Sequence, residues 1–149
     1  LLLPDPENDR SLSPHALKKG FRDRDGNLWF GTWQGGVNIL RARQDPFVAF
    51  RHQPFNPQSL LTTKAAPLTA DRLGQLWVGS NKGLTRIAAD GTRFRHFNIL
   101  NSPLRANDIN PLFVSPSGRL YVSTWTAGFC VGEPGAERFT PVTLPGRSK

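Results

Sequence analysis

The chain has 149 residues, of which 38% are hydrophobic and 20% charged, a balance that is typical of a globular protein and excludes a disordered one. No run of eighteen or more apolar residues occurs, and the single cysteine, Cys130, excludes an intrachain disulfide and a cysteine-based zinc site. The formal net charge is +8, but the basic residues are scattered, which does not favour a nucleic-acid-binding protein.

The first predicted strand covers residues 15–22 and ends in a tight turn. Asp23 is placed to accept hydrogen bonds from backbone amides two or three residues further on. Gly26 can adopt the left-handed conformation that closes such a turn. The turn therefore predicts a hairpin between this strand and the next.

Three further strands complete the unit. Residues 27–32 form a second strand that is apolar on both faces, so we expect it to be covered on both sides. A glycine turn at residues 34–36 leads to a third strand at 37–42, and residues 47–51 form an outer fourth strand.

The same pattern then recurs twice. The turn glycines Gly26, Gly74 and Gly118 lie 48 and 44 residues apart, and each precedes a leucine, an aromatic, an apolar residue, a small residue and a hydroxyl. The aligned segments are Leu28-Trp29, Leu76-Trp77 and Leu120-Tyr121, the upstream residues Leu12, Leu60 and Leu104, and the outer stretches Phe47–Phe50, Phe94–Phe97 and Phe139–Val142. Four antiparallel strands repeated at this period predict an all-β fold of β-propeller blades. A β-sandwich would not repeat its sequence in this way, and a β-helix would have a shorter period.

The repeats predict about three blades of a larger propeller. The expected division is a preceding tail and connection at 1–10 and blades at 11–54, 55–101 and 102–149, with Leu1–Leu3 aligned to the outer strand end Ala49–Arg51. Three blades do not close a ring, which takes about four to eight. We therefore expect a fragment or processed product whose open ends meet the remaining blades of a parent chain or a second copy.

Two tryptophans are predicted to pack between blades. Trp29 and Trp77 occupy the same place in the second strand of their units, and Gly31 and Gly79 are expected to leave room for the indoles.

A second set of side chains is predicted to meet a ligand. The turns between second and third strands open on the same face as the blade-to-blade connections, and they carry Trp33-Gln34, Asn81-Lys82 and Trp125-Thr126. Indoles beside amide and hydroxyl groups suit stacking on a sugar ring combined with hydrogen bonds. The alternative is that Trp33 and Trp125 pack on the adjacent blade connection.

No catalytic residue, metal ligand or cofactor site is predicted. His15, His52 and His96 occupy non-equivalent places and lack metal-ligand spacing, and no nucleophile motif is present. Asp23 and Asp71 share a turn position, which indicates backbone capping rather than acid–base catalysis. Cys130 on a predicted third strand is expected to be a small buried hydrophobe.

These motifs resemble the two-component regulator propeller repeat. The first unit supplies Ser11-Leu12, Asp23, Gly26–Trp29, Gly31-Thr32 and Gly35-Gly36, and the second supplies Ser59-Leu60, Asp71, Gly74, Leu76-Trp77, Gly79-Ser80 and Gly83. In the third unit Leu104, Asn107, Gly118 and Leu120 remain, whereas Ser115 replaces the turn aspartate and Tyr121 the tryptophan.

The resemblance implies a periplasmic or extracellular sensor with one or two seven-bladed propellers. Such propellers precede a transmembrane helix and a cytoplasmic histidine kinase, hybrid kinase or diguanylate cyclase, so membrane contact would come only through a parent chain. Several family members are similar to receptors for poly- or oligosaccharides, which implies a small-molecule or oligosaccharide ligand here.

Two other functions remain open. The blades could be a scaffold that binds no ligand. The chain also resembles streptogramin lyases in its strands with an aspartate turn followed by a tryptophan. Those lyases lack the glycine-threonine continuation found at Gly31–Gly36, and no converging set of unlike polar residues marks an active site.

Overall fold

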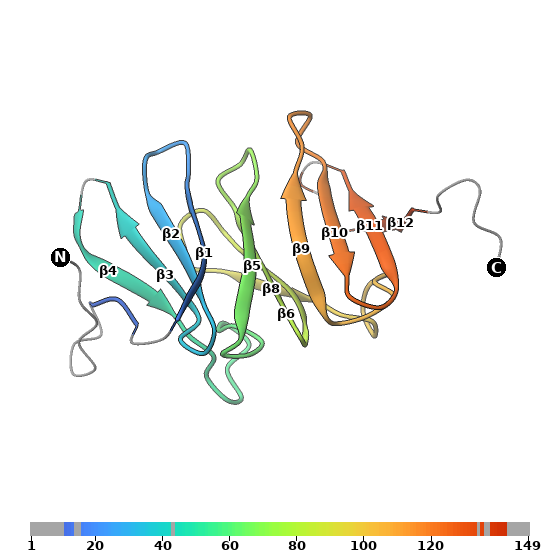
Figure 1. The fold of residues 1–149 in the computed structure, drawn as a ribbon, viewed down its shortest axis with the longest axis horizontal. Coiled ribbons are helices and arrows are strands. Elements are labelled where there is room, and N and C mark those ends of the chain that lie inside the picture. The colour runs from blue at the N-terminus through green and yellow to red at the C-terminus, as the bar shows by residue number, and fades with distance from the viewer. Residues whose placement is uncertain (1–10, 14–15, 43, 134, 136–137, 143–149) are drawn as a thin grey trace.

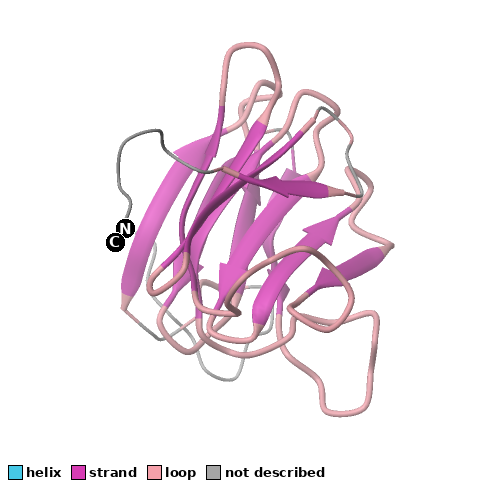
Figure 2. Cartoon of the chain, turned by 90° about the vertical axis from the view of Figure 1, so that its right-hand side faces the viewer, coloured by secondary structure: helices cyan, strands magenta, loops and turns pink. Residues whose placement is uncertain are grey.

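The structure, a computed structural model, describes residues 11–13, 16–42, 44–133, 135 and 138–142. Their regular structure consists of three four-stranded sheets that stand side by side like a fan (Figure 1). Figure 2 shows the fan from its end, with strands joined only by loops and turns. None of the described segments is a helix long and apolar enough to cross a membrane. The expected all-β class and blade architecture are confirmed.

Each sheet is an antiparallel meander in chain order. The first contains β1 (Leu17–Arg22), β2 (Leu28–Thr32), β3 (Val37–Arg41) and β4 (Gln44–Phe50). The second contains β5 (Ala65–Ala70), β6 (Leu76–Ser80), β7 (Gly83–Ile87) and β8 (Phe94–Phe97). The third contains β9 (Ile109–Val114), β10 (Leu120–Thr124), β11 (Gly128–Gly132) and β12 (Phe139–Pro141).

The strand bounds differ slightly from those expected in the first unit. β1 begins at Leu17, and residues 14–15, including His15, lie outside the described residues. β4 begins three residues earlier than predicted, at Gln44, because its ladder with β3 continues as far as the pair Arg41–Gln44. The predicted tail at 1–10, with Leu1–Leu3, and the end of the third unit at 143–149 also lie outside the described residues.

The turn after the first strand of each sheet has one conformation. The amide of Asp23 donates to the carbonyl of Asn27 at 3.0 Å, and the amide of Gly26, which has φ +85°, donates back to the carbonyl of Asp23 at 3.2 Å. The same pair of bonds closes the turns at Asp71 and Ser115. The left-handed glycine predicted from the sequence is therefore confirmed as the residue that reverses the chain.

The repeated hydroxyl closes the turn between the second and third strands. Thr32 Oγ1 donates to the carbonyl of Gly36 at 2.9 Å and accepts from the amide of Gly35 at 2.8 Å. Ser80 and Thr124 form the corresponding two bonds in their own sheets. A side chain with one donor and free lone pairs is needed here, which explains why each copy carries serine or threonine.

The hydrophobic core lies between the sheets. One cluster joins the first two sheets around Val37, Leu68 and Val78, with the half-buried Trp29 packed against it. The other joins the second and third sheets around Trp77, which is 2% exposed and packs its indole against Phe97 and Phe139. The prediction that both tryptophans fill the space between blades is confirmed.

The turns at the two ends of the strands form two opposite edges of the fan. Contacts join β1 to β5 and β5 to β9, so the inner strands of successive sheets adjoin. The turns between β1 and β2, β5 and β6, and β9 and β10 lie along one edge (Figure 1). The turns between β2 and β3, β6 and β7, and β10 and β11 lie along the other edge with the sheet-to-sheet connections, which we call the connection edge.

The expectation that the second strand is covered on both sides is correct for β6 but wrong for β2. All five residues of β6 are buried, whereas Leu28 in β2 is 37% exposed. Trp29 points to the second sheet, while Leu28 and its neighbour Phe30 belong to the face that no described sheet covers. The third sheet has a similar open face, where Phe113 is 56% exposed beside Tyr121.

The role expected of Gly79 is corrected as well. A Cβ at this residue would lie 2.6 Å from Pro67 Cγ and 2.8 Å from Ile109 Cγ2. The missing side chain therefore makes room for Ile109 at the start of the next sheet and for Pro67, and not for an indole.

Candidate functional site

The six residues predicted to meet a ligand lie on the connection edge. They occupy the turn after β2 (Trp33, Gln34), the turn after β6 (Asn81, Lys82) and the turn after β10 (Trp125, Thr126), and all six are exposed. Each turn belongs to a different sheet, so the three turns follow one another along this edge of the fan (Figure 1). In the described part of the chain no hydrogen bond or ring contact joins the three turns.

Trp33 is held by its backbone and flanked by two cations. Its amide donates to the carbonyl of Ala16 at 3.1 Å, and its side chain remains 48% exposed. Lys18 Nζ, from β1, lies 4.9 Å from the centroid of the indole, and Lys64 Nζ lies 5.7 Å from it. Lys64 ends the connection that leads into β5, so the indole does contact the adjacent blade connection, as the alternative interpretation expects.

Trp125 is held in the same way but is more open. Its amide donates to the carbonyl of Asp108 at 3.1 Å, which corresponds to the bond between Trp33 and Ala16. Its side chain is 78% exposed, and no cation lies over its ring within the described residues. A large indole held at the surface on a fixed backbone is available for stacking. Whether either tryptophan contacts a ligand stays a prediction.

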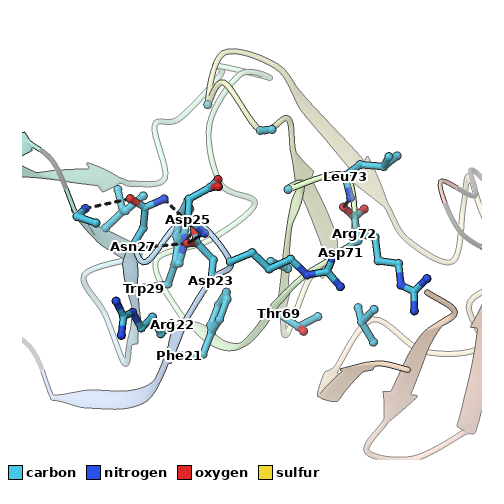
Figure 3. A pocket seen from close by; sticks show the side chains of 18 of the residues that line it. Phe21, Arg22, Asp23, Asp25, Asn27, Trp29, Thr69, Asp71, Arg72 and Leu73 are labelled. Atoms are coloured by element: carbon cyan, nitrogen blue, oxygen red, sulfur yellow. Dashed lines mark hydrogen bonds between the residues drawn. The ribbon is translucent and has the colours of Figure 1, made fainter. Parts of the chain in front are cut away.

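The opposite edge holds a pocket of about 1210 Å³ that sequence reasoning did not predict. Residues in and beside the turns of the first two sheets face each other across it, with Asp23, Asn27 and Trp29 on one side and Asp71 and Arg72 on the other (Figure 3). Its charged lining residues are Arg22, Arg24, Arg41, Arg72, Asp23, Asp25, Asp71 and Asp90. Four cations against four anions give this pocket no net charge.

The acids of this edge are engaged in structure. Asp23 Oδ1 accepts from the amides of Asp25 and Asn27, at 3.0 and 2.9 Å, while Oδ2 accepts from the Asn27 side chain and from Trp29 Nε1, at 2.9 and 2.7 Å. Partial burial raises the pKa of Asp23, but the bonds from Trp29 and Asn27 outweigh it and hold the pKa below its ordinary value.

Asp71 repeats this arrangement in the second sheet. It accepts from the amides of Leu73 and Gln75, and its Oδ2 lies 2.9 Å from Trp77 Nε1. In the third sheet Ser115 Oγ accepts from the amide of Arg119 and shares a hydrogen bond with Ser117 Oγ, and Tyr121 brings no indole N–H to the turn. The capping role predicted for the aspartates is confirmed. The hydrogen bond from the tryptophan indole to the turn aspartate was not predicted from the sequence, although both residues are replaced together in the third repeat.

The histidines and the cysteine have structural partners. His52 Nδ1 lies 2.6 Å from the carbonyl of Leu60, and His96 bridges Thr85 Oγ1 and the carbonyl of Pro57, at 3.1 and 3.0 Å. Cys130 is buried on β11, and burial raises the pKa of its thiol, as expected for an inert side chain. Over the described ranges, no group of three or more histidine, cysteine or acidic residues could hold a metal ion.

Comparison with known proteins supports this architecture. Residues 21–34 match the model of the two-component regulator propeller family. The extracellular domain of the hybrid two-component system BT3049 from B. thetaiotaomicron superimposes with a TM-score of 0.78 at 20% identity, over 97% of this chain and 20% of that one. A comparison with curated proteins gives no match.

Two other solved structures share the fold. PorZ, a surface component of the type-IX secretion system of Porphyromonas gingivalis, has a TM-score of 0.62 at 23% identity, over 77% of this chain and 17% of PorZ. Catalytically inactive virginiamycin B lyase from Staphylococcus aureus, solved with quinupristin, has a TM-score of 0.66 at 15% identity, over 97% of this chain and 44% of the lyase. The chain thus spans a fifth or less of the first two proteins. It carries a two-component regulator propeller repeat within a set of three propeller blades, which confirms the fold and the family resemblance expected from its sequence.

Proposed function

We propose that the chain is part of the ligand-sensing propeller of a two-component or diguanylate cyclase receptor, outside the cytoplasm, and that it catalyses no reaction itself. Support comes from the matched repeat and from the fold shared with an extracellular two-component domain. Signalling output and the membrane anchor then belong to the rest of the receptor.

We further propose that an oligosaccharide or another small molecule binds along the connection edge. The observation that carries this proposal is the pair of exposed indoles, Trp33 and Trp125, at equivalent positions on two sheets. Each is fixed by a backbone hydrogen bond to the residue before an inner strand, so ordering the turn costs little entropy on binding. Asn81 and Lys82 on the middle sheet add polar groups between the two rings.

The test is a glycan-binding measurement on Trp33→Ala and Trp125→Ala. We expect each change to weaken binding about tenfold or more while the urea midpoint stays near that of wild type. Phe55→Ala is the matched control, because Phe55 is a fully exposed aromatic in the connection between the first two sheets and lies outside the three turns. Equal binding by all three variants would refute a ligand site at the indoles.

The open outer faces support a second proposal about partners. Leu28 on the first sheet and Phe113 on the third expose apolar surface on the sides that face away from the second sheet. We propose that these faces pack on further blades of a parent chain or on a second copy. Light scattering on the chain and on Phe113→Lys measures this: a monomeric wild type at high concentration would contradict pairing between copies.

An enzyme of the lyase type is the weaker candidate. It shares the fold at 15% identity, which carries no catalytic residue over to this chain. The two described histidines, His52 and His96, each contact a backbone carbonyl of the connection between β4 and β5, which is a structural role.

A further inference from the structure

We propose that Trp33, Lys18 and Lys64 form a subsite for an acidic sugar, so that the ligand is an oligosaccharide carrying carboxylate or sulfate groups. This inference rests on the proposed function, because it names the class of ligand that the connection edge receives.

The first observation is the convergence of two ammonium groups on one indole. Lys18 comes from the first sheet and Lys64 from the connection to the second, and their Nζ atoms lie 4.9 and 5.7 Å from the same ring centroid. Both side chains are exposed, and neither forms an ion pair in the part of the chain that the structure describes. An anionic group that reaches the ring can therefore accept a charge-assisted hydrogen bond from either ammonium without displacing a carboxylate of the described residues.

The second observation is the difference between the two edges. The pocket on the opposite edge balances four arginines with four aspartates. Around the three turns and the sheet-to-sheet connections of the connection edge, the described residues supply the cations Lys18, Arg51, Lys64, Lys82 and Arg105 against the single acid Asp108. Unbalanced positive charge on one edge attracts anionic ligands and orients them toward it.

The indole determines what kind of anion fits. An ammonium over an exposed ring is weakly held, whereas an ammonium that donates to a carboxylate forms a charge-assisted hydrogen bond, which is stronger. When an acidic sugar arrives, the flexible lysine side chains turn from the ring to its anionic group. The half-exposed ring of Trp33 is then free to stack on the apolar face of that sugar.

Trp125 provides the contrast along the same edge. It occupies the equivalent turn, but the described residues place no cation over its ring. The carbonyl that fixes its amide belongs to Asp108, whose carboxylate would disfavour an anion nearby. We therefore assign the acidic sugar to the Trp33 turn and an uncharged sugar to the Trp125 turn.

The test uses a panel of uronate-containing oligosaccharides and the same oligosaccharides after reduction of their carboxyl groups. Binding to the full chain is measured by calorimetry at two salt concentrations. We expect the acidic forms to bind more tightly at low salt, and Lys18→Gln or Lys64→Gln to reduce that affinity about tenfold. Affinity for the reduced forms should change less than about twofold.

Lys19→Gln is the matched control, since it removes the same charge from the next residue of β1, away from the ring. Urea midpoints within error of wild type show that the variants are folded. Acidic binding that survives both Lys18→Gln and Lys64→Gln overturns the subsite, as does equal binding of acidic and reduced forms. In the latter case the proposed oligosaccharide site stands without its acidic subsite, whereas binding of neither form contradicts an oligosaccharide site on this edge.

Discussion

The hydrogen bond between the turn aspartate and the indole gives the sharpest prediction about stability. Asp71 Oδ2 accepts from Trp77 Nε1 at 2.9 Å, and Trp77 is 2% exposed in the core between the second and third sheets. Asp71→Ala removes the acceptor while the ring remains in place, so that an indole N–H is left without a partner in the core.

The expected cost follows from these contacts. A buried donor that loses its partner costs about 1–3 kcal/mol. The amides of Leu73 and Gln75 also lose their acceptor, but they lie in a partly exposed turn where water replaces it, so that loss costs about 1 kcal/mol by analogy with helix caps. Asp71→Ala should therefore lower the free energy of unfolding by about 2–4 kcal/mol.

A double-mutant cycle isolates the bond itself. Trp77→Phe removes the N–H but keeps an aromatic ring in the core, so its cost should be smaller in the Asp71→Ala background than in wild type. We expect a coupling of about 1–2 kcal/mol from urea unfolding followed by circular dichroism. Asp90→Ala is the control, because Asp90 caps an exposed turn through two hydrogen bonds from Thr92 and none from an indole. A cost for Asp71→Ala no greater than for Asp90→Ala, or additive costs in the cycle, would refute this reasoning.

Three further predictions concern packing, pH and the thiol. Gly79→Ala places a Cβ against Pro67 and Ile109 and should lower the free energy of unfolding by about 1–3 kcal/mol, measured by urea unfolding. An unchanged urea midpoint would instead show that the two sheets can move apart at no cost. The pKa of the Asp23 carboxyl is lower in the folded protein than in the unfolded chain. The ionised carboxylate therefore stabilises the fold fully at pH values above the unfolded-state pKa, and this stabilisation is lost as the pH falls through the folded-state pKa. When the urea midpoint is measured at successive pH values from 7 downward, we expect it to decrease once the pH is below about 4, and to decrease less steeply in Asp23→Asn than in wild type. The same pH dependence in both proteins would contradict this. Cys130 should react with a thiol reagent only in denaturant, and rapid reaction of the native protein would show that β11 is accessible.

The repeat made most of the fold predictable. Its glycine, leucine and tryptophan recur because each reports a local requirement: a left-handed turn residue, a buried strand residue and a ring between sheets. Such requirements depend on one unit and its neighbour, so three aligned copies were enough to identify them. The exposure of Leu28 was not predictable in this way, since it depends on what covers the end of the array.

The candidate site was only partly predictable. The position of Trp33 follows from the repeat, but its contact with Lys64 depends on the angle between two sheets, which leaves no periodic trace in the sequence. The pocket on the opposite edge also depends on the angle between sheets, because residues from the turns of different sheets line it. The pairing of Asp71 with Trp77 did leave a trace, in the joint replacement by Ser115 and Tyr121.

The two edges of the fan therefore carry different physical tasks. On the edge of the aspartate turns, the repeated carboxylates are committed to backbone amides and indoles, so substitutions there act first on stability. On the connection edge the repeated hydroxyls close each hairpin from within, which leaves the turn side chains without a structural bond to preserve. Residues such as Trp33, Asn81 and Trp125 can consequently differ from blade to blade at little cost to the fold. That freedom fits the proposed role of the connection edge as the edge that receives a ligand.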